Sequence, residues 1–307
     1  MRRIFVQEVA MRDGFQIEPR FVPTAEKIAL IDALSECGLA KIEVTAFVSP
    51  KAVPNLRDAE EVMCGIRRID GVVYSALVPN ARGAERALAC GTGELNLVMS
   101  ASETHNRANL NRTTAQSLDG LAEVRSVVEG SGVSVNGSIS TAFGCPFEGA
   151  VAPARVLGFV ERYLELGMDR VTLADTTGMA HPRQVAALTR EVLARFPALE
   201  LTLHFHNTRG MGLANVLAAL DAGGTRFDAS LGGLGGCPFA PGATGNICTE
   251  DLAHMLTAIG YDTGVDLERL LRVARRLPSI VGHEVPGQVA KAGRIGDLHP
   301  PPTALAL

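Results

Sequence analysis

Two histidines separated by one residue, His204 and His206, are the clearest chemical signal in the sequence. They end the apolar segment ELTLHFH, which is typical of a β-strand. Residues two apart on a strand point to the same face, so both imidazoles would enter the same space. An isolated pair of this kind is more often part of a hydrogen-bonded core. The many carboxylates at the ends of other predicted strands favour a divalent metal site instead.

Asp13 is the expected third metal ligand. It follows the first predicted strand, and in a closed eight-stranded barrel the first and seventh strands lie on the same side. Two imidazoles with hard oxygen ligands suit Mg²⁺ or Mn²⁺, with Zn²⁺ and Co²⁺ as alternatives. The competing interpretation of Arg12 and Asp13 is a local turn with a surface ion pair.

Two further carboxylates stand in or at the end of predicted strands. Glu43 lies between Ile42 and Val44, which point the other way, so Glu43 should face the barrel interior and need a partner such as Arg12. Asp175 ends the segment RVTLAD. It could be a base, a carboxylate that orients a metal ligand, or a helix cap, and capping is the commonest role.

The segment 232–246 (GGLGGCPFAPGATGN) is rich in glycine, which makes its ordering entropically unfavourable. A mobile lid over an active site would explain that composition, and a long tight turn is the alternative. Cys237 in its middle is either a reactive thiol or an incidental small residue.

Eight short apolar runs alternate with amphipathic segments and would position these groups. The predicted strands are 4–9, 41–45, 72–79, 94–100, 133–141, 170–175, 200–206 and 226–232. The predicted helices are 24–37, 118–128, 154–166, 182–196, 212–222 and 251–259.

This alternation predicts an α/β fold, a single (β/α)8 TIM barrel over residues 1–293 with a C-terminal helical and loop extension. Residues 294–307 are expected to form a disordered tail. A doubly wound open sheet is the second choice, but no GxGxxG motif follows the first strand. Catalytic residues of TIM barrels lie at the carboxyl ends of the strands, where the candidates above are found.

Composition excludes several classes of partner. The 307-residue chain is 47% hydrophobic, has a formal net charge of -4, and contains no basic block and no apolar run of bilayer length. We therefore expect neither a nucleic-acid nor a membrane partner. The six cysteines form no CxxC pair, which suggests a reducing compartment, and we expect a cytoplasmic protein.

The sequence resembles the 3-hydroxy-3-methylglutaryl-CoA lyases of the DRE-TIM metallolyase superfamily over residues 4–293. The resemblance is carried by residues 8–16 (EVAMRDGFQ), 42–50, 143–149, 174–178, 204–208 and 232–251. It departs from the usual family pattern at Met11, Ile17 and Asn207, and over residues 102–112. No departure removes a proposed ligand, but together they suggest a bacterial branch of the family and leave the acyl group of the substrate open.

The resemblance implies roles for individual residues. Asp13, His204, His206 and Asn246 would bind the metal, and Asn246 follows from the resemblance alone. Arg12 would stabilise an enolate oxygen, and Cys237 would assist proton transfer. Candidates for further catalytic and substrate contacts are Glu43, Asp175, His204, Gln16 and the strand-end residue Thr141.

The implied reaction is a metal-dependent retro-Claisen cleavage that gives acetyl-CoA and acetoacetate. His206 or Asp175 would remove the hydroxyl proton, and Cys237 or a histidine would protonate the enolate. Alternatives are a related acyl-CoA such as citramalyl-CoA, a condensing synthase, for which the chain is short, and a non-catalytic barrel. The resemblance also implies a homodimer.

An acyl-CoA substrate needs contacts for its phosphates. Arg20, Lys51 and Arg107 lie near predicted strand-end loops and are candidates, although ordinary solvated charge is the commoner role for any one of them.

Overall fold

Eight parallel strands close into a barrel in chain order, as the sequence predicts. The computed structural model describes residues 2–236, 245–298 and 300. The strands are β1 Phe5–Glu8, β2 Lys41–Ala46, β3 Val73–Leu77, β4 Glu94–Ser100, β5 Ser134–Ser140, β6 Arg170–Asp175, β7 Glu200–Phe205 and β8 Arg226–Ala229. The barrel confirms the predicted fold class and excludes the doubly wound sheet.

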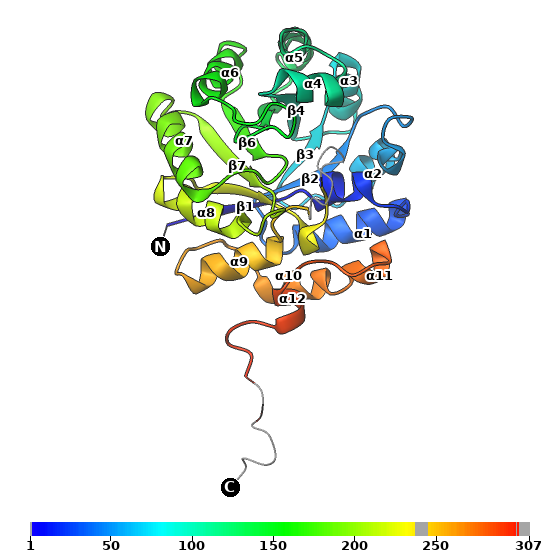
Figure 1. Cartoon of the computed structure of the whole chain (residues 1–307). Coiled ribbons are helices and arrows are strands. Elements are labelled where there is room, and N and C mark those ends of the chain that lie inside the picture. Colours follow the sequence, from blue (N-terminus) through cyan, green and yellow to red (C-terminus); the bar gives the residue numbers. More distant parts are fainter. Residues whose placement is uncertain (1, 237–244, 299, 301–307) are drawn as a thin grey trace.

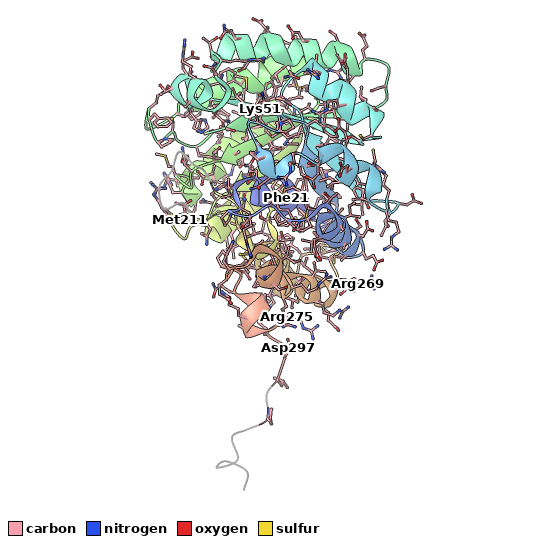
Figure 2. All side chains as sticks on the ribbon, turned by 90° about the vertical axis from the view of Figure 1, so that its right-hand side faces the viewer. Phe21, Lys51, Met211, Arg269, Arg275 and Asp297 are labelled. Carbon is pink, nitrogen blue, oxygen red and sulfur yellow. The ribbon has the colours of Figure 1, made fainter. Side chains whose placement is uncertain are left out.

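Helices surround the barrel (Figure 1). They are α1 Thr24–Ser35, α2 Ala59–Gly65, α3 Ala81–Ala89, α4 Glu103–Leu110, α5 Thr114–Val128, α6 Pro153–Glu165, α7 Pro182–Arg195, α8 Gly212–Asp221 and α9 Thr249–Ala258. Three more helices follow, α10 Leu267–Ala274, α11 Leu277–Val281 and α12 Val289–Ala292. These three lie below the barrel with α9, in the part of the molecule where Arg269, Arg275 and Asp297 are labelled in Figure 2. They form the expected C-terminal extension.

The predicted eighth strand was too long. β8 stops at Ala229, and Leu231–Gly233 form a 3₁₀ turn (η4) in which Gly232 has φ 65°. Gly232 can adopt this left-handed conformation because it has no side chain, and the resulting turn ends the strand. The expected disordered tail falls mostly on residues 299 and 301–307, which lie outside the described residues.

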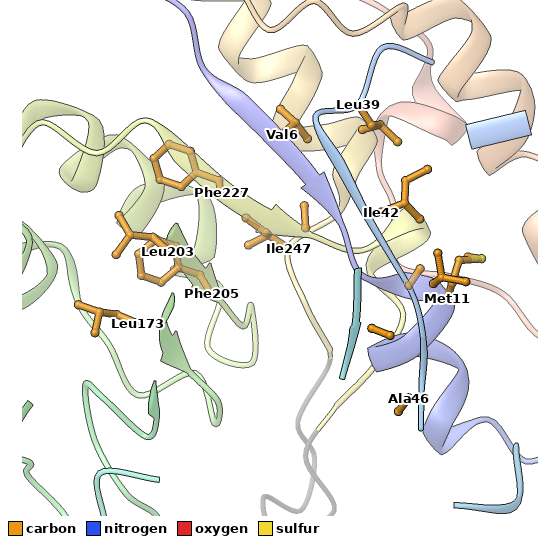
Figure 3. Close-up of a cluster of buried hydrophobic side chains, with 14 of the residues drawn as sticks. Val6, Met11, Leu39, Ile42, Ala46, Leu173, Leu203, Phe205, Phe227 and Ile247 are labelled. Atoms are coloured by element: carbon orange, nitrogen blue, oxygen red, sulfur yellow. The ribbon is translucent and has the colours of Figure 1, made fainter. Parts of the chain in front are cut away.

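The outward faces of the strands pack against the helices and form the core. Leu173, Leu203, Phe205 and Phe227 lie together on the outer side of β6, β7 and β8 (Figure 3). Because side chains alternate along a strand, Leu203 and Phe205 facing outward place His204 and His206 on the inward face.

Ion pairs lie at the amino-terminal end of the polar barrel interior. Lys41 and Arg170 each lie 2.7 Å from a carboxylate oxygen of Glu94, and Arg226 lies 2.7 Å from Glu200. These residues begin strands β2, β6, β4, β8 and β7. The cavity described below therefore opens at the carboxyl ends of the strands, the functional end of such barrels.

Among the described residues, no helix is long and apolar enough to cross a membrane.

Candidate metal centre and active site

Three ligand atoms converge at the mouth of the barrel. The Nε2 atoms of His204 and His206 are 3.1 Å apart, and Asp13 Oδ2 lies 3.9 Å and 4.0 Å from them. All three residues are buried. Two nitrogens about 2.1 Å from one ion at right angles are about 3.0 Å apart, so the spacing of the two imidazoles suits a shared cation. The structure thus brings together the three ligands expected from strand geometry.

Asp13 is placed by a π-helical turn, η1 Ala10–Gly14, directly after β1. Such turns are rare and are often found at functional sites. Gly14 at its end lets the turn approach η4 closely, since a Cβ there would lie 2.8 Å from Leu234 Cβ. Asp13 therefore supplies the ligand, and Gly14 allows the turn to hold that ligand in position.

Asn246 is held beside His206 by backbone pairing. The two residues form an antiparallel bridge, and Ile247 N donates to Phe205 O at 3.2 Å. Asn246 Nδ2 donates to Asp13 Oδ2 at 2.7 Å, while its Oδ1 is buried without a hydrogen-bond donor among the described residues. A buried carbonyl oxygen in that condition is destabilising unless a cation or donor reaches it. The donor set therefore fits a divalent metal ion.

Protonation in the site also favours metal binding. Burial opposes ionisation of Asp13, but the positive charge of Arg12, aided by His204 and by the hydrogen bond from Asn246, outweighs it and lowers the pKa of Asp13 to about 2. Burial, together with the neighbouring His204, lowers the pKa of His206 to about 3, so His206 is a neutral imidazole. A carboxylate and a neutral imidazole are the forms that bind metal.

Asp228 on β8 orients His204, and sequence reasoning missed it. Its Oδ2 lies 3.2 Å from His204 Nδ1, which leaves Nε2 for a metal ion. The hydrogen bond and charge of Asp228 raise the pKa of His204 against the effect of burial. Asp228 alternates with the apolar Phe227 and Ala229, the same signal that singled out Glu43.

Arg12 faces the same cavity and is fixed by two carboxylates. Its Nε donates to Glu43 Oε2 and its Nη1 to Asp13 Oδ1, both at 2.6 Å. Glu43 Oε1 accepts from Asn96 Nδ2 at 2.7 Å, so the buried carboxylate is satisfied. Gln16 donates to Asp13 Oδ1 at 3.0 Å. The structure therefore brings Glu43 and Arg12 together as expected, and places Gln16 beside the ligand Asp13.

Asp175 and Thr141 are buried and do not line the cavity. Asp175 Oδ1 accepts from the backbone N–H groups of Met179 and Ala180 in the loop before α7, so it stabilises a turn and does not cap a helix, since His181 is the N-cap of α7. Burial raises the pKa of Asp175 to about 6. Thr141 is fully buried in a left-handed conformation, with φ 54°. Its Oγ1 donates to Ser140 O at 2.7 Å. The neighbouring Thr176 and Ser140 line the cavity instead.

A cavity of about 480 Å³ joins the metal residues to the opposite side of the barrel mouth. Besides Arg12, Asp13, Gln16, His204 and His206, its wall includes further polar residues: Asn80, Asn96, His105, Asn109, Arg112, Thr176 and Asp228. Among the described residues, Arg20, Lys51 and Arg107 do not line it. Lys51, labelled in Figure 2, is exposed on the segment after β2. Cys237 and the middle of the expected lid, residues 237–244, lie outside the described residues.

Comparison with known proteins decides the family. The HMGL-like family model matches residues 3–277. The chain belongs to the HMGL-like family. It is 46% identical to a hydroxymethylglutaryl-CoA lyase of Bacillus subtilis, over 94% of this chain and 96% of that one. It is 42% identical to the (R)-citramalyl-CoA lyase of Chloroflexus aurantiacus, over 96% of each.

A solved structure agrees with this assignment. An HMG-CoA lyase from Acinetobacter baumannii, solved in complex with coenzyme A and 3-methylmalate, superposes with a TM-score of 0.94. It is 56% identical, and the match covers 97% of this chain and 98% of that one. The resemblance found in the sequence motifs is therefore confirmed, both in family and in fold.

Proposed function

We propose that this protein is a metal-dependent carbon–carbon lyase that cleaves 3-hydroxy-3-methylglutaryl-CoA to acetyl-CoA and acetoacetate. The observation that carries the proposal is the convergence of Asp13, His204 and His206 on one cavity that Arg12 also faces. That arrangement supplies a cation site and a fixed positive charge to the same small volume. The two hydroxymethylglutaryl-CoA lyases described above support the substrate.

The metal would be held by Asp13, His204, His206 and Asn246, and we favour Mg²⁺ or Mn²⁺ because two of these ligands are hard oxygens. When bound, it would orient the substrate and lower the pKa of its tertiary hydroxyl group. Asp228 keeps His204 in the orientation that directs Nε2 toward the ion.

The protein's own groups would move the protons and stabilise the charge. Of the two expected bases, Asp175 acting through a water molecule is the better candidate for taking the hydroxyl proton, because its pKa is raised to about 6 whereas that of His206, a proposed metal ligand, is lowered to about 3. The C2–C3 bond then breaks, its electron pair passes to the thioester, and a ketone and a thioester enolate result. Protonation of the enolate carbon, with Cys237 or a histidine as donor, yields acetyl-CoA.

Arg12 is suited to stabilise the enolate oxygen. Glu43 and Asp13 occupy its Nε and Nη1 atoms, so the guanidinium is held in one orientation. Burial opposes the charged form, but Glu43 and Asp13 raise the pKa of Arg12 further above its ordinary value. A permanent cation fixed before the reaction stabilises developing negative charge effectively in a dry site.

A second substrate, citramalyl-CoA, is favoured by one observation, the 42% identity to a citramalyl-CoA lyase over 96% of both chains. Its acyl group is one methylene shorter. Discrimination of one methylene is worth roughly 10–200-fold, so one pocket can favour either thioester.

The test is acetyl-CoA release by metal-reconstituted enzyme with each thioester. The proposal expects a higher kcat/KM for 3-hydroxy-3-methylglutaryl-CoA. Turnover of citramalyl-CoA with none of the longer thioester would establish the second substrate and refute the first.

A further inference from the structure

The metal-binding end accounts for only part of the cavity. On the other side of the barrel mouth, the cavity runs between the segments that follow β2 and β3 and the helices α4 and α5. This arm is largely apolar: Val48, Ala52, Val53, Leu77, Val78, Pro79, Leu110 and Leu121 line it. β3 and β4 stand opposite β7 and β8 in the closed barrel, so the arm leads away from the histidines.

One guanidinium, that of Arg112, stands in this arm. Arg112 lies in the turn between α4 and α5, is half-buried, and lines the cavity. Its backbone oxygen accepts from Asn106 Nδ2 at 2.9 Å, and Asn106 is itself fully buried. This hydrogen bond holds the backbone of Arg112 in place and so limits where its side chain can reach.

Gly120 on α5 makes room for the Arg112 side chain. A Cβ at Gly120 would lie 2.6 Å from Arg112 Nη1 and 3.7 Å from its Cζ. Glycine is unfavourable inside a helix by about 1 kcal/mol relative to alanine. At this position the missing methyl group lets the guanidinium lie against the helix.

The charge of Arg112 is not neutralised by the protein that surrounds it. Within residues 2–236 and 245–298, no carboxylate forms an ion pair with Arg112, whereas nearby Arg107 pairs with Glu103 at 2.9 Å. A positioned, unpaired guanidinium at an apolar cavity wall is suited to an anion, and its planar fork matches phosphate oxygens.

We propose that Arg112, seated on Gly120, binds a phosphate group of the coenzyme A part of the substrate. The inference rests on the proposed acyl-CoA substrate. The pantetheine portion of that molecule is long and uncharged, which suits the apolar arm, and its phosphates lie at the end remote from the thioester. Arg112, which lines the cavity, rather than Arg20, Lys51 or Arg107, which do not, is then the phosphate contact.

The test compares thioesters that carry successively fewer phosphates. The same acyl group is presented on coenzyme A, on 3′-dephospho-coenzyme A, on 4′-phosphopantetheine and on pantetheine. Wild type, Arg112→Ala, Arg112→Lys and the matched control Arg107→Ala are assayed with each. A charge-assisted hydrogen bond predicts about a 10–100-fold rise in KM for Arg112→Ala with the coenzyme A thioester, at nearly unchanged kcat.

The rise in KM caused by Arg112→Ala should disappear once the phosphate that Arg112 binds is removed from the thioester. Arg112→Ala should equal wild type on the pantetheine thioester, Arg112→Lys should be intermediate on coenzyme A, and Arg107→Ala should match wild type throughout. Loss of this rise in KM already at the 3′-dephospho thioester assigns Arg112 to the 3′-phosphate. Loss only at a later truncation assigns it to the pyrophosphate.

Two results would overturn the inference: no rise in KM in Arg112→Ala, or an equal rise on the coenzyme A and pantetheine thioesters. Calorimetric binding of free coenzyme A separates this failure from failure of the proposed function. If wild type cleaves neither thioester but Arg112→Ala still weakens coenzyme A binding tenfold or more, the phosphate-binding role of Arg112 is supported and the proposed lyase reaction is refuted. Gly120→Ala should weaken binding in the same direction, because its methyl group displaces the guanidinium.

Discussion

Removal of Asp228 should weaken metal binding without removing any ligand. Asp228 contacts His204 Nδ1 at 3.2 Å and is buried beside it. In Asp228→Ala, His204 loses the acceptor that fixes its ring and its tautomer. Loss of such a partner typically lowers metal affinity about 10–100-fold, or about 1.4–2.7 kcal/mol. Asp228→Asn keeps an oxygen acceptor and should fall between wild type and Asp228→Ala.

The assay is titration of metal-free protein with Mn²⁺ by calorimetry, followed by activity at several Mn²⁺ concentrations. Activity of Asp228→Ala should recover substantially at saturating metal, because the proposed ligands remain. Thr202→Val is the matched control. Thr202 stands two residues before His204 on the same inward face, is equally buried, and contacts Gln7 at 3.3 Å. An Mn²⁺ affinity of Asp228→Ala within twofold of that of Thr202→Val would refute the orienting role.

Three other outcomes are expected. Glu250 has its pKa raised to about 8 by burial, so the folded protein binds its proton more tightly than the unfolded chain does. This contribution to stability is complete below pH 4.5 and is lost as the pH rises toward 8. Urea unfolding should show wild type losing on the order of 3 kcal/mol between pH 5 and 8 and Glu250→Gln losing clearly less, and equal slopes would contradict the assignment. Glu43→Gln should lower kcat at least tenfold with little change in Mn²⁺ affinity, because it frees Arg12 Nε from its carboxylate partner; unchanged kcat measured at saturating substrate would show that this pairing is unimportant. Metal at about 100 times its Kd should stabilise the folded state by about 2.7 kcal/mol, so chelation should lower the Tm measured by calorimetry. An Asp13→Ala control should show no such shift, and a similar shift there would place the metal elsewhere.

The strands were predictable because their periodicity is a local property. Apolar, β-branched runs identified all eight strands, and alternation around Phe205 correctly directed both histidines inward. The intervals that hold α2, α3 and α4 were expected to be helical, but no bounds were predicted for these helices, which have seven to nine residues. The tertiary barrel, rather than their own sequence, stabilises helices of this length.

Site residues placed by a single strand were predictable, whereas those placed by contacts between distant parts of the sequence were not. His204 and His206 follow from one strand, and Glu43 from its apolar neighbours. Asn246 reaches His206 only through a long-range bridge, so only resemblance suggested it. Asp228 could have been found by the argument used for Glu43. Arg112 could not, because its significance depends on Gly120 and on a cavity built from distant segments.

Metal stoichiometry tests the central claim most directly. Metal-free wild type, Asp13→Ala and His206→Ala are titrated with Mn²⁺, and free ion is followed by electron paramagnetic resonance. We expect one tightly bound ion per chain in wild type and loss of that ion in both variants, with circular dichroism unchanged. Retention of one ion at wild-type affinity in Asp13→Ala and His206→Ala would show that the metal, and the chemistry assigned to it, does not belong at this site.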